Sequence, residues 1–467
     1  FQRLNLTGEA GFHELLNWQL AQVRRYGEPG FSLLGLRVDN LDQVFAELGE
    51  MRGHTLVDAL VERVQEIIRD TDRCTRSSED VLWMLLPRTP AVGLQRLQER
   101  LLDAKPGDVI EIPAGRHAFD RSLTLRASGV TIRGAGMDKS VLSFKGQKAG
   151  AEGLLVNGDD FTIENLTIED SRGDGLKISE SSNITIRGVK VQWTGGPSTK
   201  NGAYGIYPVL TKNVLIEDTV SIGASDAGIY VGQSDGVIVR RSRAEQNVAG
   251  IEIENTLNAD VYDNVATGNT GGILVFNMPG LSQQGGNIRV YDNKVIANNH
   301  ENFGAKGTPV ASVPAGSGIV INSNDDIEVF GNEIRDNATA NIIVSSVYST
   351  GYKDSSASPN FDPYPERIYI HGNTLSGGGD SPDGFDLKAL KVATYGLRGR
   401  FPDVLWDGYF NKERRVDGKK IGPQICLRDV SGVVNADGPG GYGNPSKDAK
   451  AHDCELPRLP AVDLKRG

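Results

Sequence analysis

The first hundred residues mix helical and strand patterns of apolar positions. Apolar residues recur at helical spacing in three segments, 12–27, 44–70 and 91–104. Two continuous apolar runs, FSLLGLRVD and VLWMLLP, are typical of buried strands. Together these patterns predict a small α/β domain over residues 1–104.

From KPGDVIEIPAG onward, short strands alternate with Gly, Asn, Asp and Ser turns, and the pattern repeats about every 23 residues. The clearest copies are residues 160–182, 213–235 and 236–258, and the third strand of each reads Gly-Ile-x-Ile or a close variant. Units this short bury a core only by stacking on their neighbours. Three strands per unit without a helix predict a parallel β-helix of about ten coils, roughly 50 Å long at ~4.8 Å per coil.

The predicted fold is therefore mainly β. A small α/β domain, 1–104, precedes a β-helix at 105–400 and a C-terminal coil, cap and tail at 401–467. Asparagines also recur at one register, and we expect their amides to form a structural column along the stack. They are Asn165, Asn264, Asn293, Asn332 and Asn373.

Composition narrows the functional classes. A net charge of −10 argues against a nucleic-acid polymer as partner, which requires a basic face. No apolar run reaches the length of a transmembrane helix. The six histidines are scattered without HExxH or CxxC, so no zinc site is expected. Phe1 in place of methionine indicates a fragment or processed product, from which a signal peptide or anchor can have been removed.

Three cysteines are present. Cys74 lies in the first domain. Cys426 and Cys454 are close enough in sequence to form a disulfide, which implies an oxidising compartment. Two separate free thiols are the alternative, and the sequence leaves both open.

The first domain resembles a degenerate, truncated member of the GGDEF family, the diguanylate cyclase fold, over residues 4–104. The resemblance rests on NLTGEAGFHELLNWQLAQVRRYGEPGFSLLGLRVDNLDQVFAELG and on the hairpin TRSSEDVLWMLLP. It places the family's Gly-Gly-Asp/Glu-Glu-Phe turn on residues 78–82, with Val81 where the essential second acid should be. The family's metal-binding aspartate falls on Arg37, although Asp39 remains.

The same resemblance puts the guanine-reading residues of the family on Phe45 and His54. Cyclase chemistry needs carboxylates that hold magnesium against a triphosphate. We therefore expect no cyclase activity.

At the family's inhibitory site, in contrast to the catalytic positions, the expected residues are present. It is an Arg-x-x-Asp before the hairpin, which falls on Arg69 and Asp72, and the following helix could supply Arg96 or Arg100. Arginine offers a planar fork to guanine or phosphate. The resemblance thus implies cyclic di-GMP as a ligand, although a solvated helix end is the simpler reading of Arg-x-x-Asp.

Residues 105–400 resemble right-handed parallel β-helix proteins of the pectate-lyase-like kind. That group includes polysaccharide lyases, hydrolases and epimerases as well as non-catalytic binding proteins, so it indicates fold better than function. The Asp-Pro-His-Asp of alginate epimerases is absent.

Insertions predict where a groove lies. Turns on both sides of the Gly-Ile-x-Ile strand lengthen in several coils, as in TGGPSTKNGAY and NNHENFGAKGTPVASVPAGS, and such loops commonly carry sites. Strand alternation turns x outward. The successive outward residues are Lys177, Tyr207, Tyr230, Glu252 and Leu274. Two positions further along lie Glu254, Phe276 and Asn322, and the turns before the strands carry Asp174 and Asp226.

This column could carry carbohydrate chemistry. A uronate lyase needs a base, an acid and a neutralising cation, and a glycosidase needs two carboxylates. Candidate catalytic residues are Lys177, Tyr207, Tyr230, Glu252 and Glu254, in a groove with Asp174, Asp226, Phe276 and Asn322. Exposed tyrosines and turn aspartates are also ordinary in β-structure. The turns NGDD and SNDD are candidate Ca²⁺ ligands but are more often simply turns.

Three functions follow as hypotheses. The first is binding or modification of a polysaccharide outside the cytoplasm. The second is a cyclic di-GMP receptor with the β-helix as output module, and the third is a structural or adhesive solenoid. The compartments conflict, because cyclic di-GMP is cytoplasmic whereas such β-helices and disulfides are usually exported.

Overall fold

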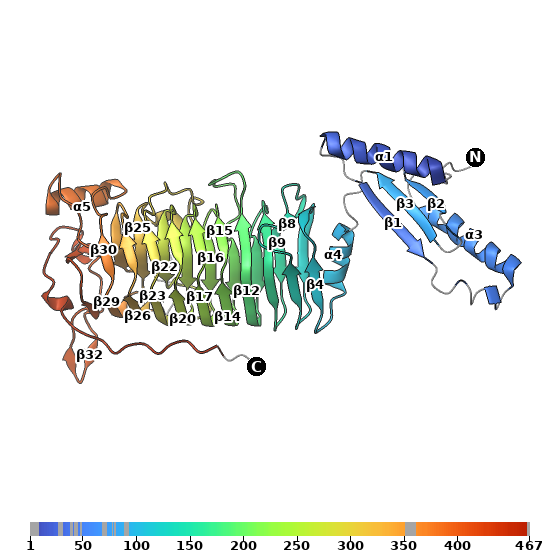
Figure 1. The fold of residues 1–467 in the computed structure, drawn as a ribbon. Helices are drawn as coiled ribbons and strands as arrows, with labels where there is room; N and C mark the ends of the chain where they lie inside the picture. The colour runs from blue at the N-terminus through green and yellow to red at the C-terminus, as the bar shows by residue number, and fades with distance from the viewer. Residues whose placement is uncertain are drawn as a thin grey trace. The chain divides into compact units, whose positions relative to one another are not determined.

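The computed structural model describes residues 9–26, 31–37, 41, 45–46, 49–67, 72–76, 78, 81–87, 93–350 and 361–464. The chain divides into two compact units, Phe1–Leu97 and Gln98–Gly467 (Figure 1). None of the described helices is long and apolar enough to cross a membrane. The three-part division expected from the sequence stays a prediction.

The N-terminal unit is built on a three-stranded antiparallel sheet. Its strand order is β1 (Phe31–Arg37), β3 (Val81–Pro87) and β2 (Arg73–Arg76). The helices are α1 (Glu9–Tyr26), α3 (Glu50–Ile67) and α4 (Gly93–Leu102), the last of which continues into the second unit. A small core of Cys74, Leu82 and Met84 holds the sheet together, with Val61 of α3 packed against it.

The second unit is a parallel β-helix, which confirms the fold predicted from the 23-residue repeat (Figure 1). The Gly-Ile-x-Ile strands form one sheet of eleven strands. They are β6 (Arg121–Leu125), β9 (Ala149–Val156), β11 (Leu176–Ser179), β13 (Ile206–Val209), β16 (Ala227–Gly232), β19 (Ala249–Glu254), β22 (Gly271–Phe276), β25 (Ser317–Asn322), β28 (Ala340–Ser345), β31 (Val404–Trp406) and β35 (Val433–Asn435).

The remaining strands of each coil form the other walls. One series is β4 (Val109–Ile112), β7 (Thr131–Gly134), β10 (Thr162–Glu169), β12 (Ser182–Gln192), β14 (Lys212–Glu217), β17 (Asp235–Arg240), β20 (Leu257–Tyr262), β23 (Gly286–Tyr291), β26 (Asp325–Phe330), β29 (Glu366–His371) and β34 (Ile425–Leu427). The other is β5 (Gly115–Ala118), β8 (Ser140–Ser143), β15 (Val220–Ile222), β18 (Arg243–Glu245), β21 (Val265–Thr267), β24 (Lys294–Ile296), β27 (Glu333–Arg335) and β30 (Thr374–Ser376). A short hairpin, β32 (Arg415–Val416) and β33 (Lys419–Lys420), and helix α5 (Phe385–Tyr395) lie outside the coils.

Inward side chains of equivalent strands stack directly on one another. In the eleven-stranded sheet this column is aliphatic and fully buried, because alternate residues of each strand face the interior. Its members are Ile206, Ile229, Ile251, Ile273, Ile319 and Ile342.

Two asparagine columns run inside the turns. In the predicted column, each side-chain oxygen accepts from the backbone N–H and the amide of the previous coil, at 2.9–3.0 Å, from Asn264 through Asn293 and Asn332 to Asn373. Asn165 does not belong to this column; it is exposed, with a φ of 60°. A second column, Asn247, Asn269, Asn298 and Asn337, was not predicted.

The C-terminal segment runs back along the β-helix (Figure 1). A disulfide joins Cys426 of β34 to Cys454, so of the two alternatives the bonded pair is the one formed. Beyond it, Arg458 contacts Glu328 at 2.8 Å, and the Leu459 N–H donates to the same carboxylate at 2.9 Å. A cavity of about 450 Å³ lies here, lined by Arg289, Glu328, Phe330, Gly331, His371, Gly372, Arg458 and Leu459.

Candidate functional site

The predicted outward column is present on the eleven-stranded sheet. The strand register places Lys177 beside Tyr207, Tyr230 beside Glu252, and Glu252 beside Leu274. Neighbouring strands in such a stack are ~4.8 Å apart, so these side chains lie within reach of one another. Lys177 and Tyr207 are partly exposed, whereas Tyr230 and Glu252 are each 4% exposed.

Three tyrosine rings meet at this column. Tyr204 lies with its ring centroid 4.4 Å from that of Tyr207 and 4.5 Å from that of Tyr230, and the last two are 5.0 Å apart. Sequence reasoning missed Tyr204, although it ends the long turn TGGPSTKNGAY immediately before its strand. An aromatic residue at the end of an enlarged turn was the signal that could have identified it.

Three carboxyl groups surround the tyrosines. The Tyr204 hydroxyl hydrogen-bonds to Asp226, and the Tyr230 hydroxyl donates to Glu254. Glu252 differs, because its Oε2 is buried and has no hydrogen-bond partner among the described residues. We call these six residues, Tyr204, Tyr207, Tyr230, Asp226, Glu252 and Glu254, the tyrosine–carboxyl cluster.

Burial and mutual repulsion shift these carboxyl groups toward their protonated forms. Burial, with the neighbouring Glu254 and Asp174, raises the pKa of Asp226 to about 8. Burial, Asp226 and Glu254 raise the pKa of Glu252 well above its usual range. Burial also raises the pKa of Glu254, although the Tyr230 hydroxyl opposes the shift. Each of these carboxyl groups therefore keeps its proton to a higher pH than an exposed carboxyl group does, unless a positive charge lies beside it.

Lys177 and Asp174 border the cluster. The Lys177 Nζ lies 5.1 Å from the centre of the Tyr207 ring, within the range of a cation–π contact. Asp174 accepts from the Tyr204 N–H at 3.3 Å, and burial raises its pKa to about 6. Burial, with Asp174 next in effect, raises the pKa of Tyr207 to about 12, so the phenol is neutral in the physiological range.

A glycine sets the position of Tyr230. A Cβ added to Gly232 would clash with the ring and the hydroxyl of Tyr230. The hydroxyl end of the ring therefore lies over the bare backbone two residues ahead, and the hydroxyl donates to Glu254 on the next strand.

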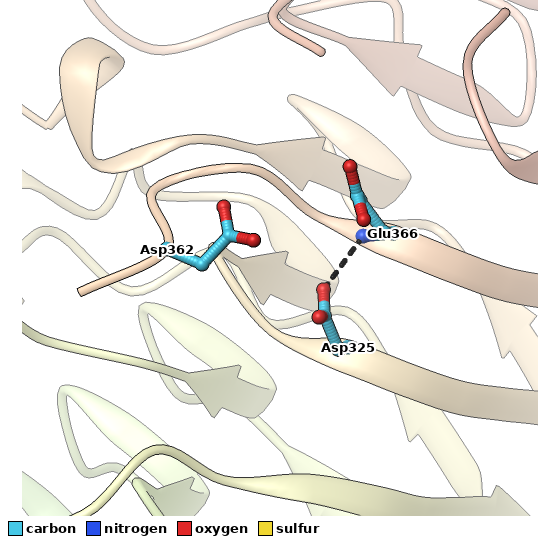
Figure 2. A group of neighbouring side chains, drawn as sticks. All are labelled: Asp325, Asp362 and Glu366. Atoms are coloured by element: carbon cyan, nitrogen blue, oxygen red, sulfur yellow. Dashed lines mark hydrogen bonds between the residues drawn. The ribbon is translucent and has the colours of Figure 1, made fainter. Parts of the chain in front are cut away.

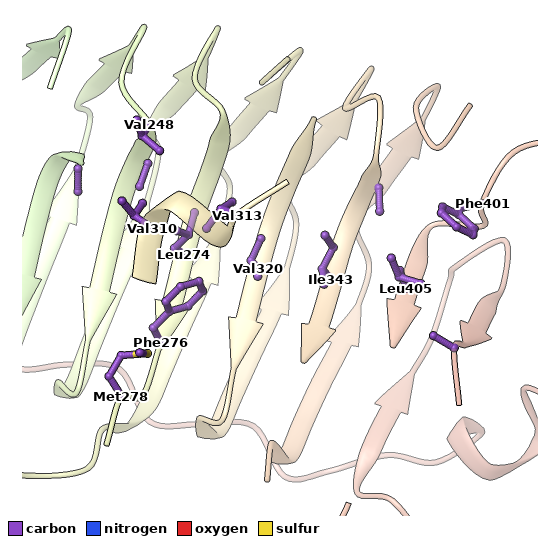
Figure 3. Close-up of a cluster of buried hydrophobic side chains, with 14 of the residues drawn as sticks. Val248, Leu274, Phe276, Met278, Val310, Val313, Val320, Ile343, Phe401 and Leu405 are labelled. Carbon is purple, nitrogen blue, oxygen red and sulfur yellow. The ribbon is translucent and has the colours of Figure 1, made fainter. Parts of the chain in front are cut away.

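Beyond Glu252 the outer face of the sheet is covered. Val310 and Val313, in and beside a 3₁₀ turn at Pro309–Ser312, pack on Leu274 (Figure 3). Further along, Leu390 of α5 and Phe401 join the same cluster of buried side chains. The long turns thus fold onto the sheet here.

Because these turns cover the sheet, the open part of the groove is shorter than the sequence predicted. Phe276 is 4% exposed and Asn322 is fully buried, so neither lines an open surface. Asn322 instead accepts from the Ser345 hydroxyl at 3.1 Å. The partly exposed end of the column is the stretch at Lys177 and Tyr207, and the tyrosine–carboxyl cluster lies where the cover begins.

A second acidic group occurs beyond the turn that follows the eleven-stranded sheet, where β26 and β29 begin. Asp325, Asp362 and Glu366 each place a carboxylate oxygen within 4.8 Å of the others (Figure 2). Asp325 belongs to the predicted candidate turn SNDD. However, Arg367 pairs with Asp325 and Arg414 pairs with Glu366, so arginines already offset the charge of two of these three carboxylates. In the other candidate turn, NGDD, Asp159 accepts the Ser182 N–H at 2.7 Å, as a turn residue does.

In the N-terminal unit, the strand register brings Arg37 directly opposite Val81. These are the two positions at which the GGDEF resemblance requires carboxylates. The rings of Phe45 and His54, at the positions for reading guanine, contact each other with centroids 4.9 Å apart.

The predicted cyclic di-GMP residues are only partly described. Arg69 and Asp39 lie outside the described residues, as does the side chain of Arg96. Asp72 is buried, at 4% exposed. Arg100 donates to the Val109 carbonyl of the first coil at 3.3 Å. Binding of cyclic di-GMP stays a prediction.

Comparisons with known families agree with both resemblances. Residues 5–112 match the family described as diguanylate cyclase, GGDEF domain, and residues 128–280 and 199–352 match the right handed beta helix region. The chain thus combines a GGDEF region with a right-handed β-helix, and both resemblances found in the sequence are confirmed.

Several solved structures are similar to the β-helix. The Azotobacter vinelandii mannuronan C-5 epimerase AlgE4 A-module is 20% identical, with 67% of this chain and 86% of that chain covered and a TM-score of 0.45. The periplasmic alginate epimerase AlgG is 15% identical over 59% and 74%, with a TM-score of 0.39. Pectate lyase Pel9A is 14% identical over 60% and 70%, with a TM-score of 0.35. No curated protein is similar to the chain.

Proposed function

We propose that the β-helix binds and modifies a polysaccharide at the tyrosine–carboxyl cluster, beside a GGDEF region that has lost cyclase chemistry. The observation that supports this most is the convergence of three tyrosine rings and three carboxyl groups on one outer face. Tyrosine rings provide flat apolar surfaces with polar edges, which suits sugar rings. Paired carboxyl groups of different protonation provide an acid and a base.

The environment divides these roles among the carboxyl groups. Glu252 is buried beside two other acids, and it is therefore the candidate proton donor. Glu254 accepts a hydrogen bond from Tyr230, which favours its ionised form and makes it the candidate base. Glu252 and Glu254 are two residues apart on one strand and so share a face, roughly 7 Å apart at the backbone. Cleavage of a glycosidic bond by two carboxyl groups needs this kind of separation.

Loss of cyclase chemistry is supported by the register of the N-terminal sheet. Arg37 opposite Val81 puts a cation and an apolar side chain where two magnesium-binding carboxylates would be required. Incubation of the purified chain with GTP and Mg²⁺ tests this directly. We expect no cyclic di-GMP, and its formation would overturn this part of the proposal.

Binding to a panel of polysaccharides tests the main proposal. Affinity electrophoresis of the purified chain should show retardation by at least one sugar polymer. Tyr207→Ala should weaken that binding about fivefold, since an aromatic contact is worth about 1 kcal/mol beyond its area. Tyr442→Ala is the control, because Tyr442 is 51% exposed and lies outside the cluster. No retardation by any polymer would reject the proposal and favour a purely structural solenoid.

Modification is tested separately from binding. Release of reducing ends, or of unsaturated or epimerised sugars, is measured with the polymers that bind. Glu252→Gln and Glu254→Gln should each abolish turnover while Tyr442→Ala retains it. Binding without turnover in the unaltered chain would reduce the proposal to a carbohydrate-binding surface.

A further inference from the structure

The charges around the tyrosine–carboxyl cluster are strongly one-sided. Asp226, Glu252 and Glu254 act on one another electrostatically, and Asp174 and Glu152 extend the acidic group toward the exposed end of the column. Among the described interactions of these carboxyl groups, the one cation is Lys177. It lies three strands from Glu252, about 14 Å at the spacing of the stack. Lys177 therefore cannot compensate the inner acids.

One acidic oxygen in the cluster lacks any partner. Glu252 is 4% exposed, and its Oε2 forms no hydrogen bond with the described residues. The adjacent acids Asp226 and Glu254 are each hydrogen-bonded to a tyrosine hydroxyl. A buried carboxyl oxygen without a donor is costly, and native proteins rarely retain one unless a ligand or water supplies the donor. The ionised form of Glu252 thus lacks a hydrogen-bond donor, and a cation beside it would supply both a donor and the charge that favours ionisation.

We infer that the sugar polymer bound at the tyrosine–carboxyl cluster carries free, protonated amino groups, so that an ammonium group of the sugar lies against Glu252 and Asp226. This inference rests on the proposed function and names its substrate class. An ammonium group brings three N–H donors and one positive charge to a place that lacks both. The tyrosine rings then hold the body of the same sugar residue.

Other classes of sugar fit these residues less well. A uronate would bring a further carboxylate beside acids that already repel one another, with only the distant Lys177 to oppose it. A neutral or N-acetylated sugar would bring hydroxyl or amide donors but no charge. The acidic cluster therefore discriminates against polyuronates and favours amino sugars with free amines.

The test compares three oligosaccharides of equal length by calorimetry at neutral pH, because acidic pH would hold Asp226 and Glu252 in their uncharged forms. They are a glucosamine hexamer, its fully N-acetylated form and an oligouronate hexamer. We expect the free-amine hexamer to bind at least about tenfold more tightly than the acetylated form, which corresponds to ~1.4 kcal/mol. We expect no measurable binding of the oligouronate.

Variants connect the preference to the cluster. Glu252→Gln should remove most of the free-amine preference, and Asp226→Asn should do so independently. Glu111→Gln is the control, since its side chain is 60% exposed and pairs with Arg133 on another sheet. Equal binding of the amine and acetylated forms, or a preference that survives both variants, would overturn the inference.

The outcomes separate this inference from the function on which it rests. Tight binding of the oligouronate or of a neutral polymer, lost in Tyr207→Ala, would overturn the substrate class but retain the polysaccharide site. Absence of binding by every sugar tested would overturn both.

Discussion

Replacement of Glu252 by glutamine should make the protein more stable at alkaline pH. Glu252 is buried between Asp226 and Glu254, and its Oε2 lacks a hydrogen-bond donor. The introduced glutamine would keep the size and shape of the side chain but could not ionise. Its amide N–H₂ could also donate to the neighbouring carboxyl groups, which glutamate can do only when protonated.

The magnitude follows from burial of an acid without a partner. Leaving a buried charged oxygen without a donor costs about 3 kcal/mol, and burial accordingly raises the pKa of Glu252 well above its usual range. The glutamine amide would itself be partly unsatisfied, and this reduces the expected stabilisation by about 1 kcal/mol. We expect a net stabilisation of about 2 kcal/mol at pH 8. For a unit of this size that is about 2 to 3 °C in Tm.

The effect must depend on pH in one direction. Above pH 4.5 the unfolded chain releases the Glu252 proton, whereas the native protein retains it up to the raised pKa. The free energy of unfolding of the unaltered protein therefore falls as pH rises through this window. Glutamine does not titrate, so the advantage of the Glu252→Gln variant should be small near pH 4 and grow toward pH 8. Thermal unfolding followed by circular dichroism across this range measures it.

A second buried glutamate provides a matched control. Glu328 is 2% exposed, but it accepts from the Leu459 N–H at 2.9 Å and lies 3.0 Å from the His371 Nε2. Glu328→Gln breaks a paired charge and should lower the stability by about 3 kcal/mol. The reasoning fails if Glu252→Gln is less stable than the unaltered protein at pH 8, or if its advantage is the same at pH 4.

Three further predictions address the fold and the site. Gly232→Ala should displace the Tyr230 ring from Glu254, because the new Cβ would clash with that ring; polysaccharide binding should fall about tenfold while the circular dichroism spectrum is retained. Asn293→Ala should leave the buried Asn264 N–H without its acceptor and the Asn264 amide with one acceptor in place of two, and lower the stability by about 2 kcal/mol in denaturant unfolding, whereas Asn157→Ala, at an exposed position, should change it by less than about 1 kcal/mol. Alkylation under denaturing, non-reducing conditions should modify Cys74 alone, since Cys426 and Cys454 are bonded; modification of three cysteines would show that the disulfide does not form.

Much of the fold could be predicted because each repeat carries its own pattern. The Gly-Ile-x-Ile strands place isoleucine inward and a variable residue outward, and the structure stacks Ile229, Ile251 and Ile273 accordingly. The second asparagine column, at Asn247 and Asn269, was not predicted, because turn asparagines also occur simply as turn formers. Asn165 was wrongly assigned for the converse reason: it shares the residue type of the column but not its register.

The site was less predictable, because it depends on what the long turns do. Alternation correctly assigned Lys177, Tyr207, Tyr230 and Glu252 to one outer column. The alternation of inward and outward side chains along a strand does not show whether a long turn borders an open groove or packs onto the sheet and covers it. Here the apolar Val310 and Val313 within the turn could have indicated cover, since apolar residues in a long loop need a surface on which to pack.

The sequence predicts conflicting compartments, the cytoplasm for the GGDEF region and an exported location for the β-helix. This conflict is weaker if the GGDEF region has no cyclase activity, as proposed. A nucleotide-cyclising enzyme must reach GTP in the cytoplasm, but the proposed loss of cyclase chemistry, with Arg37 opposite Val81 in the strand register, would remove that requirement. The disulfide between Cys426 and Cys454, in contrast, places a requirement on the β-helix, because such bonds persist in oxidising compartments. The buried acids make a parallel argument, since they cost stability and are best explained by an external ligand that neutralises them. The proposed polysaccharide site on an exported β-helix would therefore agree with both the disulfide and the carboxyl oxygen that has no partner among the described residues.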